Sequence, residues 1–236
     1  MGIPERRERE KKELRQKILN AARELLVKKG YEAVTMREIA KRIEYSATAL
    51  YKHFADKDAL VRELCREDFA AFAQYFLQQV ASSGDPRERM ARAALSYLDF
   101  AEQYPGQYRL MFMTELPPTP PEAGEREDPA RNAYVFFRGL VDELLRGGYL
   151  RDELTDVDLV AQTAWAGVHG AAALDLIVPK SEQWLDFRPR RERFAAALEM
   201  AARNMAKDPD EFARVQRLAL EKTEKSRAAA TRKGAK

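Results

Sequence analysis

The residues between positions 47 and 57 have the types and spacing that suit contact with a nucleic acid. Thr48 and Ala49 are small enough to touch thymine methyl groups, and the Thr48 hydroxyl can reach a base edge. Larger polar side chains placed to contact phosphates follow at Tyr51, Lys52, His53 and Lys57. We take as candidate base contacts Ala47, Thr48 and Ala49, and with them Lys52, whose ammonium can reach a base edge as well as a phosphate.

Further phosphate contacts are expected where short helices begin upstream of these residues, because hydroxyls and backbone N–H groups there can face an anion. The full set of candidate phosphate contacts is Thr35, Arg37, Ser46, Tyr51, His53 and Lys57. Tyr51 or His53 taken alone would more often be a partly buried structural residue. The whole spaced constellation favours DNA binding.

These side chains need a scaffold, and the sequence supplies one. Thr35 and Glu38 have capping-box spacing, and apolar residues follow at helical intervals at Met36, Ile39, Ala40 and Ile43. Ser46 can cap a third helix whose buried face is Ala47, Leu50 and Phe54. A longer helix before them has an apolar stripe at Leu14, Ile18, Ala21, Ala22, Leu25 and Leu26. The pattern predicts a helix-turn-helix supported by a first helix.

At these residues the sequence resembles the tetracycline-repressor (TetR) family of bacterial regulators. The segment TMREIAKRIEYSATALYKHFADKDAL is similar to that family's DNA-binding signature, and the likeness runs from Ile18 to Leu64. It implies that the helix 47–53 reads base sequence and that phosphates are held by Thr35, Tyr51, His53 and Lys57. Glu44 departs from the family's usual turn glycine. A positive φ at Glu44 is therefore expected, at a cost of about 1 kcal/mol.

The rest of the chain also favours helices. Asp-Pro pairs at 85–86, 128–129 and 208–209 can start helices, and no alternating strand pattern is found. The predicted helices are 5–29, 36–43, 47–53, 57–82, 86–103, 105–112, 129–146, 156–178, 189–206 and 209–225. The predicted fold class is all-α: a three-helix head joined to a helical bundle with a dimerising four-helix interface. The expected parts are a DNA-binding domain (1–56), a connecting helix (57–84), a ligand-binding and dimerisation domain (85–225) and a basic flexible tail (226–236).

The charge distribution supports two modules. Residues 1–66 have a net charge of +6, residues 67–206 of −7 and residues 207–236 of +4. A basic first quarter suggests contact with a polyanion. The opening segment ERREREKKELRQK has two compatible interpretations, a solvated helix extension and an arm that lies on DNA.

Composition excludes several other classes. With 45% apolar and 33% charged residues the chain is globular. The single cysteine, Cys65, excludes an internal disulfide framework, and with His53 and His169 it leaves too few ligands for a zinc site. The longest uncharged stretch, Leu159 to Leu174, is 16 residues, too short to span a membrane. We expect a soluble cytoplasmic protein with no cofactor and no secretion signal.

Twelve of the 22 aromatic residues lie between Phe69 and Phe137. Aromatic residues at helical spacing are usually core residues, although helical bundles also bind small molecules among them. The sequence does not separate core from pocket. The candidate pocket residues are Phe72, Phe76, Tyr97, Phe100, Tyr108, Phe112, Phe137, Trp165 and His169.

The segment 156–178 places Trp165 and His169 four residues apart on one face, beside unusually small residues. A neutral core histidine bonded to a backbone carbonyl is the more ordinary interpretation of His169. The stretch TAWAGVHGAAALD resembles the C-terminal domain of a TetR subgroup named for its Trp-His-Gly signature. That likeness implies a ligand-responsive dimer in which helices 156–178 and 189–206 pair across a two-fold axis. The candidate interface residues are Ala166, Gly170, Ala173, Phe194 and Leu198.

These features together predict a dimeric transcription regulator, most simply a repressor. Its expected partners are a double-stranded, pseudo-palindromic operator, a second copy of itself and an apolar or aromatic small molecule, with no membrane. A helical interaction scaffold is the alternative, and it leaves the phosphate-facing residues unexplained. An enzyme is a remote third reading, since no nucleophile or acid–base pair and no phosphate-binding glycine loop is evident.

Overall fold

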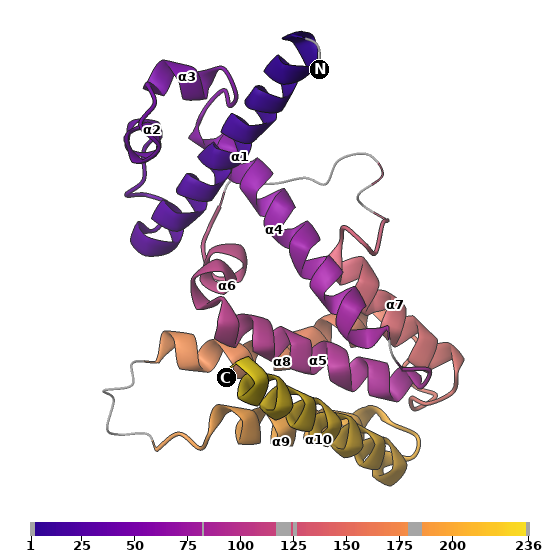
Figure 1. The fold of residues 1–236 in the computed structure, drawn as a ribbon. Helices are drawn as coiled ribbons and strands as arrows, with labels where there is room; N and C mark the ends of the chain where they lie inside the picture. Colours follow the sequence, from indigo (N-terminus) through magenta and orange to yellow (C-terminus); the bar gives the residue numbers. More distant parts are fainter. Residues whose placement is uncertain (1–2, 82, 117–123, 125–126, 179–185, 235–236) are drawn as a thin grey trace. The chain divides into compact units, whose positions relative to one another are not determined.

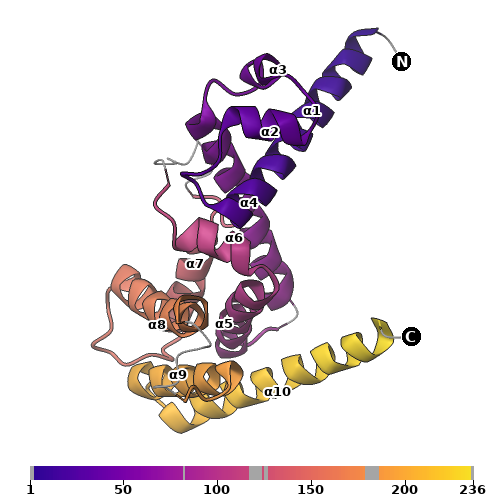
Figure 2. The same cartoon turned by 90° about the vertical axis from the view of Figure 1, so that its left-hand side faces the viewer.

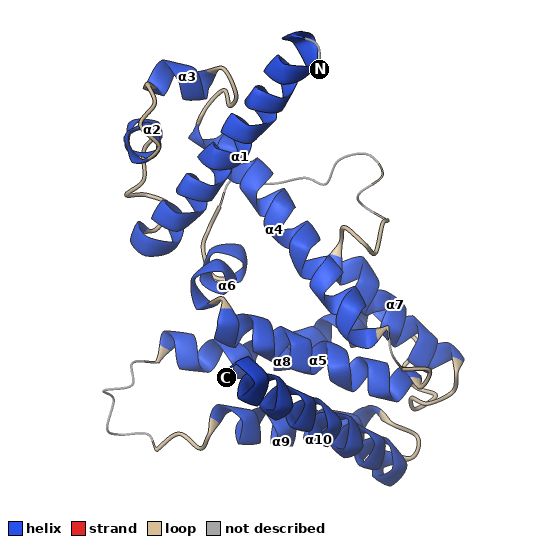
Figure 3. Cartoon of the chain, viewed as in Figure 1, coloured by secondary structure: helices blue, strands red, loops and turns tan. Residues whose placement is uncertain are grey.

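The computed structural model describes residues 3–81, 83–116, 124, 127–178 and 186–234 (Figures 1 and 2). Over these residues every regular element is a helix, and the only other backbone pairing is an isolated bridge between Leu150 and Ala206 (Figure 3). The predicted all-α fold class is confirmed. The helices are α1 (Ile3–Lys29), α2 (Met36–Arg42), α3 (Ala47–Tyr51), α4 (Lys57–Val80), α5 (Pro86–Gln103), α6 (Pro105–Phe112), α7 (Ala133–Arg146), α8 (Val157–Ile177), α9 (Arg190–Met205) and α10 (Pro209–Gly234).

The chain forms two compact units. Unit 1 consists of Met1–Ala70 and Tyr104–Ala123, and unit 2 of Ala71–Gln103 and Gly124–Lys236. The division passes through α4, so this helix contributes its first half to unit 1 and its second half to unit 2. The short helix α6 belongs to unit 1, although it follows α5 in the chain.

Unit 1 has its core where the apolar stripe of α1 meets α2, α3 and α4. Ile18 of α1, Ile39 of α2 and Leu50 of α3 are fully buried together with Leu60 and Leu64 of α4. These positions recur at helical spacing in each segment, so each helix buries one face. The helix α6 adds Leu110 to the same core.

Local signals start most of the helices. The Thr35 hydroxyl accepts the N–H of Glu38 and the Ser46 hydroxyl accepts the N–H of Ala49, each at 3.2 Å. These are the predicted N-caps of α2 and α3. The Glu38 carboxylate, however, pairs with Lys29 instead of returning to the Thr35 backbone. Of the two hydrogen bonds of the predicted capping box, the structure therefore shows the one from the Glu38 N–H to the Thr35 hydroxyl.

The start of α7 differs from the prediction. Asp128 and Pro129 begin a turn in which the Asp128 carboxylate accepts the N–H of Ala130 at 2.9 Å. The helix itself begins at Ala133, where the Asn132 side chain accepts the N–H groups of Tyr134 and Val135 at 3.1 and 3.3 Å. Asn132 is thus the cap that the sequence analysis missed.

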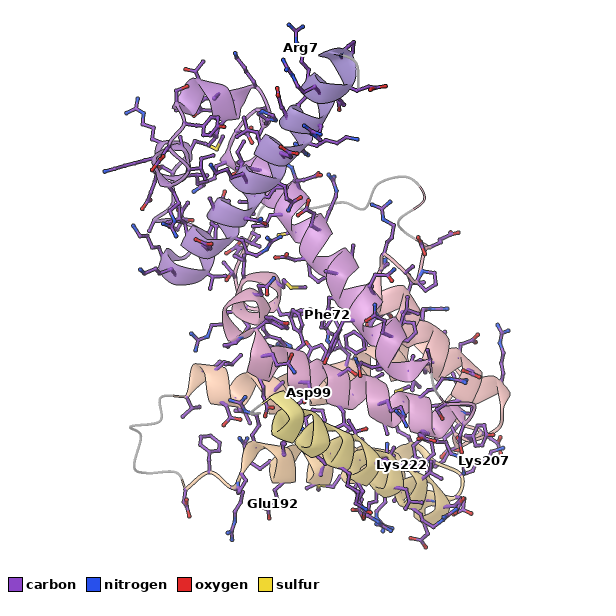
Figure 4. All side chains as sticks on the ribbon, viewed as in Figure 1. Arg7, Phe72, Asp99, Glu192, Lys207 and Lys222 are labelled. Atoms are coloured by element: carbon purple, nitrogen blue, oxygen red, sulfur yellow. The ribbon has the colours of Figure 1, made fainter. Side chains whose placement is uncertain are left out.

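Unit 2 is arranged around α5, which is in contact with α7, α8 and α10. Its buried positions include Ala93 to Ala101 without a break, as expected for a helix surrounded by others. Ion pairs fasten the neighbouring helices. Arg191 of α9 pairs with Asp99 of α5, which Figure 4 labels, and Arg193 pairs with Asp175 of α8 at 2.7 Å.

The last helix is longer than predicted. It begins at Pro209 behind the Asp208 cap, whose carboxylate accepts the N–H of Glu211 at 3.0 Å, and it continues to Gly234. The segment after 225 contains three consecutive alanines, Ala228 to Ala230, which have the highest helix propensity. Helix therefore extends into the part for which a flexible tail is expected from the sequence.

Candidate functional site

The helix-turn-helix is present as α2 and α3, with residues 43–46 between them. The second helix ends at Tyr51, two residues before its predicted end. Its last turn is closed by Leu50, whose carbonyl accepts the N–H groups of His53 and Phe54 at 2.8 and 3.0 Å. Lys52 and His53 consequently follow the helix in a turn.

The outer face of α3 is polar. Leu50 points into the core of unit 1, whereas Thr48, Tyr51 and Lys52 are exposed, Tyr51 to 52%. Of the other two candidate base contacts, Ala47 and Ala49 are half-buried, and Ala47 packs against the core. Thr48 and Lys52 are thus the candidate base contacts with the freest side chains.

The candidates near the helix starts lie on the surface. Thr35, Arg37 and Ser46 are all exposed. Thr35 and Ser46 use a hydroxyl oxygen to accept a backbone N–H, so each still has its O–H hydrogen to donate. A phosphate oxygen is a suitable acceptor for that hydrogen.

Lys57 is held by a residue that the sequence analysis did not single out. Its ammonium lies 3.9 Å from the centre of the Tyr31 ring and donates to the Tyr31 carbonyl at 3.1 Å. The Tyr31 hydroxyl in turn donates to Asp58. Burial is the largest cause that raises the pKa of Tyr31, to about 12, and the hydrogen bond to Asp58 is the next. Since an ammonium has three donors, Lys57 keeps donors for a phosphate while its position is fixed.

His53 sits beside basic residues of α1. Arg15 stacks on the neighbouring Phe54 ring at 4.3 Å and donates to the His53 carbonyl at 3.3 Å. Burial is the first cause that lowers the pKa of His53, and the charges of Arg15 and Lys11 lower it further. The imidazole is therefore neutral at pH 7 in the unbound chain, with one N–H to donate.

The turn between α2 and α3 has the backbone conformation expected of it. Glu44 has a φ of +63°, which confirms the expectation of a positive φ at this position. The N–H of Tyr45 bonds to the Ala40 carbonyl at 3.0 Å and that of Glu44 to the Lys41 carbonyl at 3.3 Å. This pair of bonds is a Schellman motif, which usually has glycine where this chain has Glu44.

The aromatic candidates divide between the two units. In unit 2, the Phe72 ring lies 4.5 Å from Phe76, 4.6 Å from Phe100 and 5.8 Å from Tyr97. All four are buried, so they fill the space among α4 and α5 with one another's rings. In unit 1, Tyr108 and Phe112 of α6 pack together at 5.1 Å.

Polar groups occur at one edge of the unit 2 cluster. Tyr97 of α5 accepts the indole N–H of Trp165 at 3.2 Å, and its oxygen lies 2.8 Å from Nδ1 of His169. Because the indole can only donate, the Tyr97 hydrogen is available for Nδ1. Burial lowers the pKa of His169, which fits a neutral imidazole. The sequence analysis considered a backbone carbonyl as the partner of His169, and the structure shows a tyrosine hydroxyl at its Nδ1.

An open groove of about 400 Å³ lies along α7 and the turn before it. Its lining includes Phe136, whose ring is 6.3 Å from Phe76 of the aromatic cluster. The predicted pocket residue Phe137 is on the same helix but packs, partly buried, against a core to which α7, α8, α9 and α10 contribute. The groove contains none of the predicted pocket residues.

The exposed residues of α8 are mostly apolar, and Met200 adds an exposed apolar side chain on α9. Ala166 and Gly170 are exposed, but Ala173, Phe194 and Leu198 are buried inside unit 2. The expected interface set is corrected accordingly, because side chains that fill the subunit's own core cannot face a partner. The large exposed apolar residues on these helices are Leu159 (64%), Trp165 (38%), Leu174 (42%), Ile177 (62%) and Met200 (67%).

Two family models match the chain over most of its length. The model described as "Bacterial regulatory proteins, tetR family" matches residues 18–64, which contain α2 and α3. The model described as "Tetracyclin repressor-like, C-terminal domain" matches residues 90–201, from α5 to α9. No helix of the described residues is long and apolar enough to cross a membrane.

Characterised relatives and solved structures agree with these matches. The chain is 32% identical to the transcriptional activator FasR of Mycolicibacterium smegmatis over 113 residues, 48% of this chain and 52% of FasR. It is 26% identical to the transcriptional repressor KstR2 of Mycobacterium tuberculosis over 160 residues, 65% of this chain and 79% of KstR2. A TetR-family regulator from Marinobacter aquaeolei has the same fold, with a TM-score of 0.62, 17% identity and coverage of 86% of this chain and 100% of its own.

The relatives are transcriptional regulators, which confirms the prediction that the chain is not an enzyme. The capped helices α2 and α3 lie within the range of the first model, and α5 to α9 lie in or overlap the range of the second. This chain belongs to the TetR family of bacterial regulatory proteins.

Proposed function

We propose that the chain is a homodimeric repressor that binds a pseudo-palindromic operator and releases it when a small molecule binds unit 2. The observation that carries the proposal is the exposed polar surface formed by Thr48 and Tyr51 of α3 and by Lys52 directly after it, backed by the fully buried Leu50. A helix so anchored can enter a major groove without disturbing its own core.

Operator recognition then requires two copies of α3. In a two-fold dimer they contact half-sites about 34–36 Å apart, or a multiple of that distance, on one side of the duplex. Thr48 and Lys52 of each copy contact base edges, while Tyr51, His53 and Lys57 contact phosphates on either side. Thr35, Arg37 and Ser46 add phosphate contacts from the starts of α2 and α3.

The dimer is held, in this proposal, by the apolar residues exposed on α8 together with Met200 of α9. Leu159, Ala166, Gly170, Leu174 and Ile177 recur at intervals of three, four or seven residues along α8, so they line one face. A Cβ built at Gly170 meets no atom within 4 Å, so the surface there is open in the single chain. Pairing this face with its symmetry mate removes the exposed apolar side chains from water.

The effector site is proposed at the Tyr97 edge of the aromatic cluster. The surroundings favour an apolar or aromatic compound, and Tyr97, His169 and Trp165 offer a hydroxyl, an imidazole and an indole to a polar group on it. A ligand that binds better when these rings separate shifts the population away from the conformation that fits the operator. Control of a bacterial operator places the protein's action in the cytoplasm.

Genomic sequence selection with the purified chain tests the proposal. We expect an enriched motif with two inverted half-sites, bound by two chains in sedimentation, with an affinity that falls steeply with salt because phosphates release counterions. An enriched site without inverted symmetry, or no enrichment above random duplex, contradicts it.

FasR is an activator and KstR2 is a repressor, so relatives regulate in both directions. We favour repression because it needs only occupancy of the operator. In vitro transcription from a promoter that contains the selected operator decides the sign. Repression appears as a loss of transcript on adding the chain, whereas a gain of transcript contradicts this part of the proposal.

A further inference from the structure

The helix α1 extends well beyond the core that it supports. Its first contact with the core of unit 1 is Leu14, and residues 4–13 are exposed without exception. We call Ile3–Glu13 the N-terminal extension. At 1.5 Å per residue it projects about 15 Å from the packed part of the helix, and Figures 1 and 2 show this end of α1 running beyond α3.

The charges of the extension are sorted by face. Arg6 pairs with Glu10 at 3.5 Å and Arg9 pairs with Glu13 at 3.4 Å. Arg7 and Lys11 lie on a different side of the helix, and neither has an ion pair with any residue that the structure describes. A cation left without a carboxylate is available to an external anion.

Arg7 and Lys11 continue the helix face that leads to the end of α3. Positions 7, 11 and 15 are spaced by four, so their side chains lie one above another. Arg15 is fixed at the far end of this row, over the Phe54 ring and against the His53 carbonyl. The charge of Lys11 is close enough to lower the pKa of His53, and Arg7 stands on the next turn outward (Figure 4).

We propose that Arg7 and Lys11 bind phosphates of the DNA duplex outside the base pairs that α3 reads. This inference rests on the proposed function and adds a binding surface to it. The ligand is the sugar–phosphate backbone flanking each half-site, recognised by charge and not by sequence. His53 and the extension thereby form one row of contacts that leaves the half-site along the flank.

The test compares two variants of the full chain that lose the same charge. Arg7→Ala/Lys11→Ala removes the unpaired cations, and Arg6→Ala/Arg9→Ala removes the paired ones from the same turns. Alanine favours helix, so both variants keep the extension helical, which circular dichroism checks. Affinity is measured by fluorescence polarisation over a salt series, on the selected operator with about ten flanking base pairs on each side and on a duplex trimmed to the half-sites.

We expect Arg7→Ala/Lys11→Ala to lower the slope of log affinity against log salt by about 3 to 4 per dimer on the long duplex, since each lost phosphate contact contributes about 0.9. The trimmed duplex and the Arg6→Ala/Arg9→Ala variant should show little of this loss. Equal losses in the two variants, or a wild-type slope in both, contradict the flank contact while the operator function stands. A wild-type chain that binds no duplex contradicts the proposed function as well.

Discussion

Units 1 and 2 each leave a helical face open to solvent, and the two faces differ in chemistry. On α3 and directly after it the open residues are polar: Thr48, Tyr51 and Lys52. On α8 they are mostly apolar, and Leu159 and Ile177 are exposed to more than 60%. Hydration satisfies the first face in the free chain, whereas the second gains free energy by leaving water.

This contrast separates the forces behind the two proposed interfaces. Binding at the α3 face depends on charge and weakens as salt rises. Pairing of the α8 and α9 faces depends on apolar area and shape, and salt affects it little. A substitution on the α3 face should therefore change DNA affinity and its salt dependence, whereas one on the α8 face should change dimerisation at any salt concentration.

The largest effect is expected at Gly170. Gly170→Leu places four carbon atoms where the single chain has open space, so each subunit should fold normally. Across a two-fold axis the same side chains overpack the contact twice, at about 1–3 kcal/mol each. We expect weaker dimerisation and a loss of operator affinity on the order of 100-fold or more, measured by sedimentation and polarisation.

Gly139→Leu is the matched control, because Gly139 is also an exposed helical glycine whose added Cβ meets nothing within 4 Å. It lies on α7, which is not part of the proposed interface, and should leave the dimer intact. A Gly170→Leu variant that remains a tight dimer and binds operator would show that α8 pairs through other residues.

A smaller effect is expected at the phosphate contacts of unit 1. Lys57→Ala should weaken binding to every duplex by about tenfold and lower the salt slope by about 2 per dimer. Tyr51→Phe should also weaken all binding by about tenfold, but with little change in slope because a phenol carries no charge. Neither should alter base preference.

Lys28→Ala, which removes an exposed cation at the end of α1, controls for general charge loss. Thermal melts of Lys57→Ala separate lost contact from lost stability, because Lys57 also packs on Tyr31. A changed base preference at unchanged affinity would assign these side chains to base reading.

At the turn between α2 and α3 we expect a stability effect without a binding effect. Glu44→Gly relieves a non-glycine residue with positive φ and should stabilise unit 1 by about 0.5–1 kcal/mol. Gly30→Ala reverses the experiment at a glycine with a φ of +81° and should destabilise by a similar amount. Urea titrations of both variants provide the measurement, and a Glu44→Gly variant without gain contradicts a strained turn.

Unit 1 was more predictable from sequence than unit 2 for a physical reason. The roles of Thr35, Ser46 and Leu50 can be predicted from neighbouring residues alone. Thr35 and Ser46 are typical N-caps, and Leu50 is the apolar position of a short amphipathic helix. On α8 the apolar residues surround the helix, so periodicity does not say which face packs inward. That is why Ala173 was expected at the surface and is buried, while Leu159 and Ile177 were not anticipated.

Other contacts lay beyond sequence reasoning because they join distant positions. Three such contacts depend on how the helices pack. They are the stacking of Lys57 on Tyr31, the stacking of Arg15 on Phe54, and the hydrogen bond between Tyr97 and His169. The residue types were visible, but a partner 15 or more positions away is not given by spacing. For α7 the failure was local: Asn132 and Asp128 are both good caps, and the later one begins the helix.

The smallest expected effect concerns the two histidines, one in each unit. Burial lowers the pKa of both, but only His53 is also affected by the charges of Arg15 and Lys11. Salt screens such charges and leaves burial unchanged. Raising the salt concentration should therefore move the pKa of His53 upward, toward 6.5, while that of His169 stays where it is.

Proton NMR of the imidazole C–H resonances measures both values, with His53→Gln and His169→Gln for assignment. The sign for stability follows from the same shifts. Below pH 6.5 the two imidazoles are protonated in the unfolded chain but remain neutral in the folded chain, because their pKa values are lowered there. The free energy of unfolding therefore falls as the pH falls toward the lowered pKa values. His169→Gln should make the free energy of unfolding less dependent on pH, equally at low and high salt. His53→Gln should have the same effect mainly at low salt. If the two resonances respond to salt alike, the basic face of α1 does not reach the end of α3, and the contrast between a charged face in unit 1 and an uncharged one in unit 2 loses this support.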